Sequence, residues 1–337
     1  MIHETGKVRA LVLRESHKGI CAAVEQLPAS EIPAGGDVTV RVLYSSLNYK
    51  DALAVTNRGK IIRGDYPFVP GIDLAGEVLE SDSPRFARGD MVIGTGWGLG
   101  EDQWGGYSET LRLRSDGLVE MPAGMQARDA MGIGTAGFTA MLSVLVLEEN
   151  DVAATSGEVV VTGASGGVGS FAVALLAGRG HDVVASSGKS EAAGYLTALG
   201  ATRIIERSVL SEGARRPLDS GTWAGAVDTV GGKTLETLLS QTRRHGCVAS
   251  CGLVGGAELH TTVYPFILRG VKLIGIDSNT CPSDQRVRAW KHLAREMELS
   301  LIREMTQVID LEEVPRMSEK MLRGEITGRI VVRLSGA

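Results

Sequence analysis

One glycine-rich segment, residues 163–169, constrains the fold of this chain more than any other feature. It follows a compact apolar run at 158–162 and precedes an apolar, helix-forming stretch at 170–177. Glycines between a strand and a helix permit a tight turn and let backbone N–H groups approach a pyrophosphate at the helix N-terminus. The spacing reads Ala164-x-Gly166-x-x-Gly169, with alanine at the first position of the usual fingerprint. This order predicts a dinucleotide site, and the alternative is a structural glycine-rich turn.

The sequence after this segment continues to alternate between strand-like and helix-like stretches. A helix is predicted at 191–199, and further strands are predicted at 181–186, 203–205, 225–228, 247–251 and 271–276. Strands that alternate with helices form parallel sheets with crossover helices. With the run at 158–162 the count is about six strands, which predicts an α/β fold with a doubly wound, Rossmann-type parallel sheet.

The flanking parts of the chain follow a different pattern. Short β-type runs at 8–13, 38–43, 76–79 and 90–93 are separated by Gly, Pro, Asp and Ser clusters, which predicts an irregular, mostly antiparallel β domain. A helix is predicted at 285–299, followed by a strand at 328–334 that returns to the first domain. We therefore expect a catalytic domain at 1–133 and 277–337 and a dinucleotide-binding domain at 134–276.

Charge and cysteine content exclude several classes of protein. The 35 basic and 40 acidic residues give a net charge of −5, which disfavours a nucleic-acid-binding protein. The four cysteines are scattered, so they predict neither a disulfide framework nor closely spaced metal ligands. Because the N-terminus lacks the features of a secretory signal, we expect a cytoplasmic protein.

One uncharged run, residues 130–147, reaches the lower length limit of a membrane span. It contains three glycines and several hydroxyl side chains, and it has no strongly basic flank. These features predict a buried turn followed by a helix in the protein core. We therefore expect no membrane partner.

The end of the second predicted strand indicates which dinucleotide is bound. An NAD site normally places Asp or Glu there to bind the ribose hydroxyls. Here the sequence from 186 to 190 is Ser-Ser-Gly-Lys-Ser. Ser187, Lys189, Ser190 and Arg207 are placed to receive a 2′-phosphate, so NADPH is the predicted cofactor. The alternative is that Lys189 is a solvated lysine at a helix start.

Motifs along nearly the whole chain resemble a known family. They lie at 45–53 (Ser-Ser-Leu-Asn-Tyr-Lys-Asp-Ala-Leu), 70–76 (Pro-Gly-Ile-Asp-Leu-Ala-Gly), 96–98, 104–106, 133–142, 223–225, 265–269, 275–278 and 328–332. Together they resemble the zinc-free, quinone-oxidoreductase-like part of the medium-chain dehydrogenase/reductase superfamily, specifically its acryloyl-CoA reductase branch. The resemblance implies a GroES-like catalytic domain beside the Rossmann domain, and a homodimer.

The resemblance also implies that no catalytic zinc is present. Zinc members carry a Cys near the first loop and Gly-His-Glu after the proline. The corresponding stretches here are 48–51, Asn-Tyr-Lys-Asp, and 71–73, Gly-Ile-Asp. A catalytic zinc needs about three protein ligands, and Cys247 and Cys251 do not supply that set.

The family's binding residues map onto this sequence position by position. Asn48, Tyr49 and Asp51 are catalytic candidates. The alternatives are an Asx turn for Asn48, packing for Tyr49 and an ion pair with Lys50 for Asp51. The cofactor candidates at the pyrophosphate are Ser165, Gly166, Gly167, Val168, Gly169 and Ser170, and those at the adenosine phosphate are Ser187, Lys189, Ser190 and Arg207. The candidates at the nicotinamide are Leu253, Ile267 and Ser278. Arg288 and Arg329 are weaker candidates, and the alternative for each is a surface ion pair.

The absence of zinc ligands favours a substrate that needs no Lewis acid. A C=C bond conjugated to a thioester accepts hydride at its far carbon, so we expect reduction of acryloyl-CoA to propanoyl-CoA. Arg58, Lys60 and Arg63 are predicted to meet the CoA phosphates, although a solvated loop is the alternative. A quinone or enone reductase and a non-catalytic NADPH-binding protein are the competing interpretations.

Overall fold

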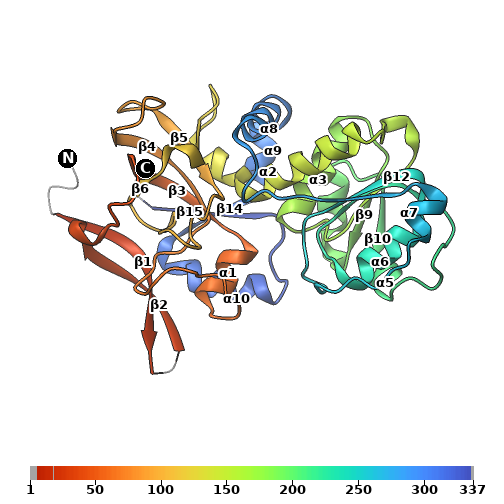
Figure 1. Cartoon of the computed structure of the whole chain (residues 1–337), viewed down its shortest axis with the longest axis horizontal. Helices are drawn as coiled ribbons and strands as arrows, with labels where there is room; N and C mark the ends of the chain where they lie inside the picture. The colour runs from red at the N-terminus through yellow and green to blue at the C-terminus, as the bar shows by residue number, and fades with distance from the viewer. Residues whose placement is uncertain (1–5, 18, 335–337) are drawn as a thin grey trace. The chain divides into compact units, whose positions relative to one another are not determined.

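A computed structural model describes residues 6–17 and 19–334, and these form two compact units. The first unit contains the chain up to Thr135 and again from Asn279 onwards, and the second runs from Ala136 to Ser278. The predicted α/β class with a Rossmann-type sheet and a β-rich unit is confirmed. Figure 1 shows the second unit in green to cyan and the β strands of the first unit mainly in red and orange.

The second unit is built on a six-stranded sheet in which every neighbouring pair is parallel. The strand order β10-β9-β8-β11-β12-β13 is the doubly wound arrangement 3-2-1-4-5-6. The all-valine run of β8 is buried on both faces, as expected for a central strand of a parallel sheet. The strands are β8 (Val159–Val161), β9 (Val183–Ser187), β10 (Arg203–Glu206), β11 (Trp223–Asp228), β12 (Thr242–Ser250) and β13 (Lys272–Gly275).

Short helices connect these strands. The predicted helix at 191–199 is divided into a 3-10 turn, η4 (Ser190–Ala192), and a short α-helix, α4 (Ala193–Ala198). The others are α3 (Gly167–Gly178), α5 (Ser208–Ser211), α6 (Gly232–Gln241) and α7 (Tyr264–Arg269). Leu235, Leu238 and Leu239 of α6 pack with strand residues such as Val160 and Val248 in one buried cluster. The alternation of elements thus buries one continuous core.

The first unit contains a seven-stranded sheet in the order β14-β15-β3-β4-β5-β7, with β6 pairing to β3. The pairs are antiparallel except β14 with β15. The predicted return of the C-terminal strand is confirmed, because β15 pairs with β3. The strands are β3 (Val38–Leu47), β4 (Asp73–Ser81), β5 (Met91–Thr95), β6 (Thr110–Leu113), β7 (Leu118–Glu120), β14 (Thr306–Asp310) and β15 (Arg329–Arg333).

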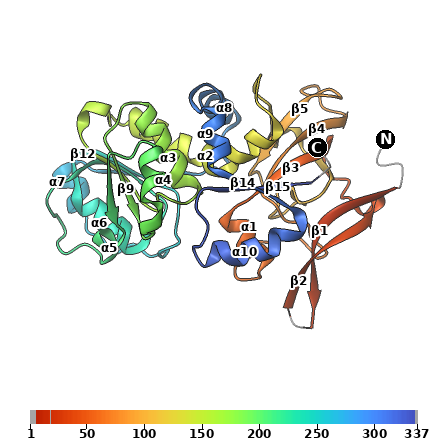
Figure 2. The same ribbon diagram turned by 180° about the vertical axis from the view of Figure 1, so that it is seen from behind.

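A separate hairpin and several helices complete the first unit. The hairpin joins β1 (Lys7–Ser16) to β2 (Gly19–Pro28) as a two-stranded sheet, visible in Figure 2. The helices are α1 (Tyr49–Val55), α8 (Ser283–Glu296), α9 (Leu299–Glu304) and α10 (Val314–Leu322). The predicted helix at 285–299 was too long, because Met297 adopts non-helical angles (φ −98°, ψ 116°) and separates α8 from α9.

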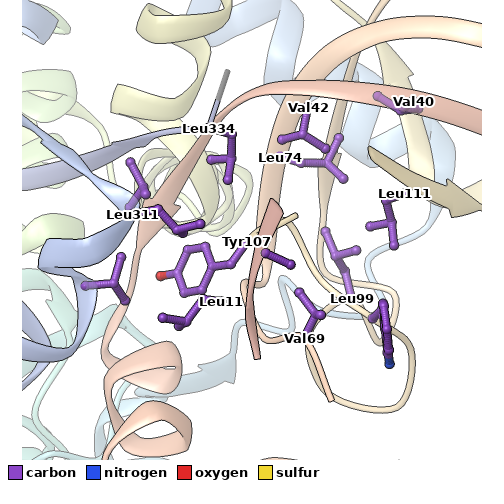
Figure 3. Close-up of a cluster of buried hydrophobic side chains, with 14 of the residues drawn as sticks. Leu11, Val40, Val42, Val69, Leu74, Leu99, Tyr107, Leu111, Leu311 and Leu334 are labelled. Carbon is purple, nitrogen blue, oxygen red and sulfur yellow. The ribbon is translucent and has the colours of Figure 1, made fainter. Parts of the chain in front are cut away.

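The core of the first unit surrounds the ring of Tyr107. Figure 3 shows this ring beside the side chains of Leu11 and Leu311, with Leu74 farther off in the same cluster, and these residues come from distant parts of the sequence. All four residues are fully buried. This packing ties the N-terminal hairpin and the C-terminal segment to the central sheet.

The apolar run at 130–147 lies within helix α2 (Ala127–Glu149). Gly134 has φ 49° and ψ −157°, which breaks the helical geometry near its start. By length and composition the helix could span a membrane, but 89% of its most apolar window is buried inside the structure. The predicted buried turn and helix are therefore confirmed, and the helix belongs to the protein core.

Candidate active site

The glycine-rich loop connects β8 to α3 by a tight turn. Gly163 has φ +56°, and the Gly166 amide donates to the Gly163 carbonyl at 2.9 Å. A Cβ on Gly169 would lie 2.3 Å from the Gly163 carbonyl oxygen, so α3 packs directly on the turn. The Ser170 hydroxyl donates to the Ala164 carbonyl at 3.3 Å and orders the first helical turn. The turn places the N-terminus of α3 at the carboxyl end of β8, which is where a doubly wound fold binds a pyrophosphate.

A buried carboxylate that the sequence analysis missed organises the neighbouring strand end. Asp228 ends β11, and its Oδ1 accepts a hydrogen bond from the Thr162 hydroxyl at 2.7 Å. Its oxygens also accept from the backbone amides of Val230 at 3.1 Å and Gly231 at 2.9 Å. Ligands bind where the strand order of a doubly wound sheet reverses, and that point lies here between β8 and β11. Asp228 therefore fixes the loops that border the predicted cofactor site.

Three of the four predicted 2′-phosphate residues, Ser187, Lys189 and Arg207, are linked by hydrogen bonds at the end of β9. The Ser165 and Ser187 hydroxyls are 3.2 Å apart, and the Lys189 amide donates to the Ser187 hydroxyl at 3.1 Å. The Arg207 amide donates to the Ser187 carbonyl at 3.0 Å. Partial burial lowers the pKa of Lys189, and nearby Glu191 opposes that shift. The backbones of Lys189 and Arg207 are thus held at the end of β9 beside the Ser187 hydroxyl, a position from which two cations could bind a phosphorylated ribose.

The other cofactor candidates remain predictions, and their surroundings differ. Val168 is half-buried in the first turn of α3, whereas Ser190 is exposed after Lys189. Leu253 and Ile267, predicted at the nicotinamide, are 65% and 69% exposed. Ser278 is half-buried at the end of the second unit, and Arg288 is exposed on α8.

The first unit holds a buried polar cluster that we call the Asp73 cluster, formed by Ser46, Asn48, Asp51, Asp73, Thr135 and Arg329. Asp73, at the start of β4, is fully buried and accepts the Thr135 amide at 2.9 Å and the Thr135 hydroxyl at 2.5 Å. It also accepts the Asn48 side-chain amide at 2.9 Å. A Cβ on Gly134 would lie 2.5 Å from an Asp73 oxygen. Only glycine allows the break in α2 to approach this carboxylate so closely.

Arg329 supplies the positive charge of the Asp73 cluster. Its Nη2 lies 3.9 Å from an Asp73 oxygen, its Nη1 donates to the Asn48 Oδ1 at 3.1 Å, and its Nε donates to the Gly132 carbonyl at 3.0 Å. Arg329 is only 3% exposed, and burial lowers the pKa of its guanidinium while Asp73 raises it. The alternative of a surface ion pair is therefore wrong for Arg329, because its guanidinium is buried and its Nη1 and Nε donate to groups of the first unit.

Asp51 ties the first loop to the loop before β4. Its Oδ2 accepts the Asn48 amide at 2.9 Å, closing the N-terminal turn of α1, and its Oδ1 accepts the Ile72 amide at 2.9 Å. Complete burial, followed by the charge of Asp73, raises the pKa of Asp51 to about 7 against the opposing effect of these N–H donors. Below that pH Asp51 is protonated, so the charge of Asp73 is balanced by Arg329.

The three catalytic candidates differ in what they are free to contact. Asn48 is 8% exposed, and both polar atoms of its amide have partners inside the Asp73 cluster. Asp51 binds backbone amides, and the proposed partner Lys50 instead pairs with Glu101 at 2.7 Å. Tyr49 is 41% exposed, and its hydroxyl has no hydrogen bond within the described ranges 6–17 and 19–334. Of the three, Tyr49 is therefore the residue whose polar group remains available to contact a ligand.

The residues at the first loop do not fit a zinc ion. Asn48 directs its amide N–H groups at the carboxylates, and the Arg329 cation already lies against Asp73. In the part of the chain that the structure describes, no group of three or more His, Cys, Asp or Glu side chains is placed to hold a metal. The arrangement stabilises the buried Asp73 carboxylate with the cation of a protein side chain, Arg329, in place of a metal ion.

The predicted CoA-contacting cations are partly neutralised by ion pairs. Arg58 lies 2.8 Å from Glu319, and Arg63 lies 3.0 Å from the buried Glu101 and 3.1 Å from Asp102. Lys60 is exposed and forms no ion pair with any residue described by the structure. Exposed ion pairs contribute little to stability, so Arg58 and Arg63 could still exchange their partners for a ligand. Lys60 is the cation of the three that has no ion-pair partner among the described residues.

Two protein-family models match the chain, and both describe dehydrogenases. The alcohol dehydrogenase GroES-like domain matches residues 34–123, and the zinc-binding dehydrogenase matches residues 167–295. Together these matches fall in both structural units. They bear out the expected pairing of a GroES-like domain with a Rossmann domain.

The chain is similar over nearly its full length to proteins from three bacteria. It is 50% identical to the probable acrylyl-CoA reductase AcuI of Escherichia coli K12, covering 97% of this chain and 100% of the relative. It is 48% identical to the acrylyl-CoA reductase AcuI of Ruegeria pomeroyi, covering 92% and 94%. It is 45% identical to the putative quinone oxidoreductase YhfP of Bacillus subtilis, covering 97% and 98%.

Solved structures of similar proteins contain nicotinamide cofactors. E. coli YhdH with bound NADPH gives a TM-score of 0.94 at 50% identity, covering 97% of this chain and all of that chain. B. subtilis YhfP with bound NAD gives 0.93 at 44% identity, covering 97% and 99%. These scores confirm the expected fold of the whole chain.

The raised pKa of Asp51 predicts a pH-dependent stability that Asp51→Asn removes. Between about pH 4 and pH 7 the folded state holds the Asp51 proton while the unfolded state has lost it, so folding stability falls as pH rises through this range. The wild type should therefore lose up to about 1.4 kcal/mol per pH unit relative to Asp51→Asn, with no further loss above pH 7. Urea unfolding at a series of pH values measures this difference.

Asp65→Asn is the matched control, because Asp65 is exposed. The pH profile of Asp65→Asn therefore serves as the baseline for the loss of an exposed carboxylate. If the Asp51→Asn profile did not depart from this baseline, Asp51 would not be the buried titrating group.

Proposed function

The chain belongs to the medium-chain dehydrogenase/reductase superfamily, in its acryloyl-CoA reductase branch, and from this premise we propose that it reduces acryloyl-CoA to propanoyl-CoA with NADPH. It is an oxidoreductase that acts on a C=C bond. The observation that carries this conclusion is about 50% identity to acrylyl-CoA reductases over more than nine-tenths of the chain. The cationic end of β9 supports NADPH, because Lys189 and Arg207 stand where NAD-specific proteins place an acid.

The chemistry requires orientation and charge stabilisation more than bond polarisation by a metal. NADPH supplies the hydride when it is bound. The thioester draws charge from the β-carbon of acryloyl-CoA, which accepts the hydride, and the α-carbon then takes a proton. We assign no role to zinc, because the groups around Asn48 and Asp73 do not fit it.

Within the first unit we propose separate roles for the three catalytic candidates. Asn48 and Asp51 are positioning residues, since their polar atoms hold the first loop against Asp73 and Ile72. Tyr49 contacts the substrate, because the residue is 41% exposed and its hydroxyl has no hydrogen-bond partner in the described part of the chain. A phenol there can donate a hydrogen bond to the thioester oxygen as negative charge develops on it.

Quinone or enone reduction is the second candidate function. The B. subtilis relative bears the name putative quinone oxidoreductase at 45% identity over nearly the whole chain. A substrate of that kind would not need a phosphate-binding cation at the site. Lys60 therefore distinguishes the two candidates, since its free charge would serve CoA phosphates and not a quinone.

A comparison of substrates tests the proposed function directly. The purified chain should oxidise NADPH in the presence of acryloyl-CoA and form propanoyl-CoA, with a higher kcat/KM than for crotonyl-CoA or a simple quinone. NADH should be a poorer donor, by about 10- to 100-fold if one charge-assisted contact to the 2′-phosphate is lost. Turnover of the quinone alone would favour the second candidate, whereas cofactor binding without any turnover would indicate a non-catalytic protein. Stoichiometric zinc in the same active sample would contradict the metal-free assignment.

In the same assay Lys60→Glu should raise the KM for acryloyl-CoA and leave the KM for a quinone unchanged, because only CoA carries phosphates. Lys291→Glu on α8 is the control, since it makes the same charge change at another exposed lysine of the first unit. If both variants raised the KM for acryloyl-CoA equally, the effect would come from the net charge of the protein and not from a contact between Lys60 and CoA.

We also propose that the protein works in the cytoplasm without a membrane or nucleic-acid partner. All four cysteines are free thiols, and Cys247 and Cys281 are buried. Unpaired cysteines fit a reducing compartment, and the net negative charge disfavours nucleic acid. Cell fractionation that recovered the protein with membranes would contradict this placement.

A homodimer is proposed on the basis of one exposed apolar segment of the second unit. Apart from the nicotinamide candidates Leu253 and Ile267, this segment, residues 253–268, exposes five further large apolar side chains, namely Val254, Leu259, Val263, Tyr264 and Leu268. This segment directly precedes β13, which is the last strand at one side of the described sheet. Apolar patches beside a sheet edge are favourable surfaces for pairing with a second copy.

Sedimentation of the purified protein should give the mass of two chains. Val263→Asp should shift the protein toward monomer, because a carboxylate would be buried in the interface. Val209→Asp is the matched control, since Val209 is similarly exposed in the same unit but lies outside the segment. A wild-type monomer, or equal effects of both substitutions, would refute this interface.

A further inference from the structure

Gly188 lies at the end of β9, between Ser187 and Lys189, and directly faces the side chain of Arg207. A Cβ at this position would be 2.6 Å from the Arg207 Cδ, 2.7 Å from its Nε and 3.1 Å from its Cζ. Its φ is outside the left-handed region, so the backbone itself would accept alanine. The missing side chain therefore provides space that Arg207 occupies.

Arg207 is held at its backbone but has a free charge. Its amide donates to the Ser187 carbonyl at 3.0 Å, while its side chain is exposed. Within the described part of the chain, the guanidinium forms no ion pair and no side-chain hydrogen bond. Neighbouring Glu206, which lies opposite Ser187 in the sheet register, also forms no ion pair with it. The Arg207 stem thus lies against Gly188 with its charge available to a ligand.

We propose that Gly188 is a cofactor-specificity residue, which selects NADPH by letting Arg207 lie across the end of β9 where a 2′-phosphate would sit. This inference rests on the proposed use of NADPH. Two features would act together in selecting NADPH: the cation of Arg207, and the absence of a side chain at Gly188, which leaves space for the Arg207 stem. Any side chain at position 188 would displace the guanidinium from the phosphate.

Displacing Arg207 would weaken the binding of NADPH but would not change the stability of the fold. Arg207 is an exposed, flexible side chain, so it can move away from a new methyl group without disturbing the core. Ser187 and the loop at 163–169 contact each other through other atoms and would keep their positions. The affinity for NADH, which lacks the 2′-phosphate, would not change.

A double-mutant cycle tests whether Gly188 acts through Arg207. The variants are Gly188→Ala, Arg207→Ala and the double substitution, and Gly194→Ala is the control because a Cβ there meets no atom within 4 Å. Titration of each full-length variant with NADPH and NADH gives the two Kd values, and thermal unfolding gives the stability. Arg207→Ala should raise the Kd for NADPH by about 10- to 100-fold.

Gly188→Ala should raise the same Kd by about 10-fold or more with no change for NADH, and the double variant should match Arg207→Ala. Gly194→Ala should leave both Kd values unchanged. If Gly188→Ala left NADPH binding intact while Arg207→Ala weakened it, or if the two effects added, the inference would fail and the NADPH assignment would stand. If Arg207→Ala changed neither Kd, the proposed cofactor site itself would be wrong.

Discussion

The buried carboxylate of Asp73 is the group on which the geometry of the first unit depends. An ionised carboxylate without partners is very costly inside a protein, so its surroundings must supply donors and a counter-charge. Thr135, Asn48 and Arg329 meet this demand, and they come from three distant parts of the chain. Satisfying one charge therefore fixes the first loop, the start of α2 and the C-terminal strand together.

In the proposed mechanism, Asn48 and Asp51 contribute to catalysis without touching the substrate. Asn48 and Asp51 lie beside the exposed Tyr49, but their polar atoms point into the Asp73 cluster. Their hydrogen bonds hold the backbone at the N-terminal turn of α1, where Tyr49 lies, and we propose that this orients the tyrosine. Precise orientation contributes much of the rate when the substrate is already activated, as a thioester-conjugated alkene is.

The Rossmann sheet could be predicted from the sequence because its signals are local. Valine-rich strands, the spacing Gly166-x-x-Gly169 and the cation at Lys189 all lie close together along the chain. The Asp73 cluster could not be predicted in this way, since the contact between Asp73 and Arg329 depends on β15 pairing with β3. The one available signal was position, because Asp73 falls in the stretch where zinc-containing relatives carry a ligand.

Smaller errors have similar causes. Helix α1 was missed because its seven residues are too few for a clear helical period, although the Asp51 side chain closes its first turn. Helix α8 was predicted too long because Met297 is a good helix former by propensity, whereas in the structure it is buried and adopts non-helical angles. Arg58 and Arg63 looked like free cations in the sequence, and only the structure shows Glu319 and Glu101 beside them.

The central claim, that this chain transfers hydride from NADPH to the far carbon of a thioester-activated alkene, has a direct isotopic test. NADPH carrying deuterium at the transferable position is incubated with acryloyl-CoA and the enzyme, and the product is analysed by mass spectrometry and NMR. The predicted result is propanoyl-CoA with one deuterium on its β-carbon and a solvent-derived proton on its α-carbon. Deuterium at the α-carbon, or propanoyl-CoA without deuterium, would contradict the claim.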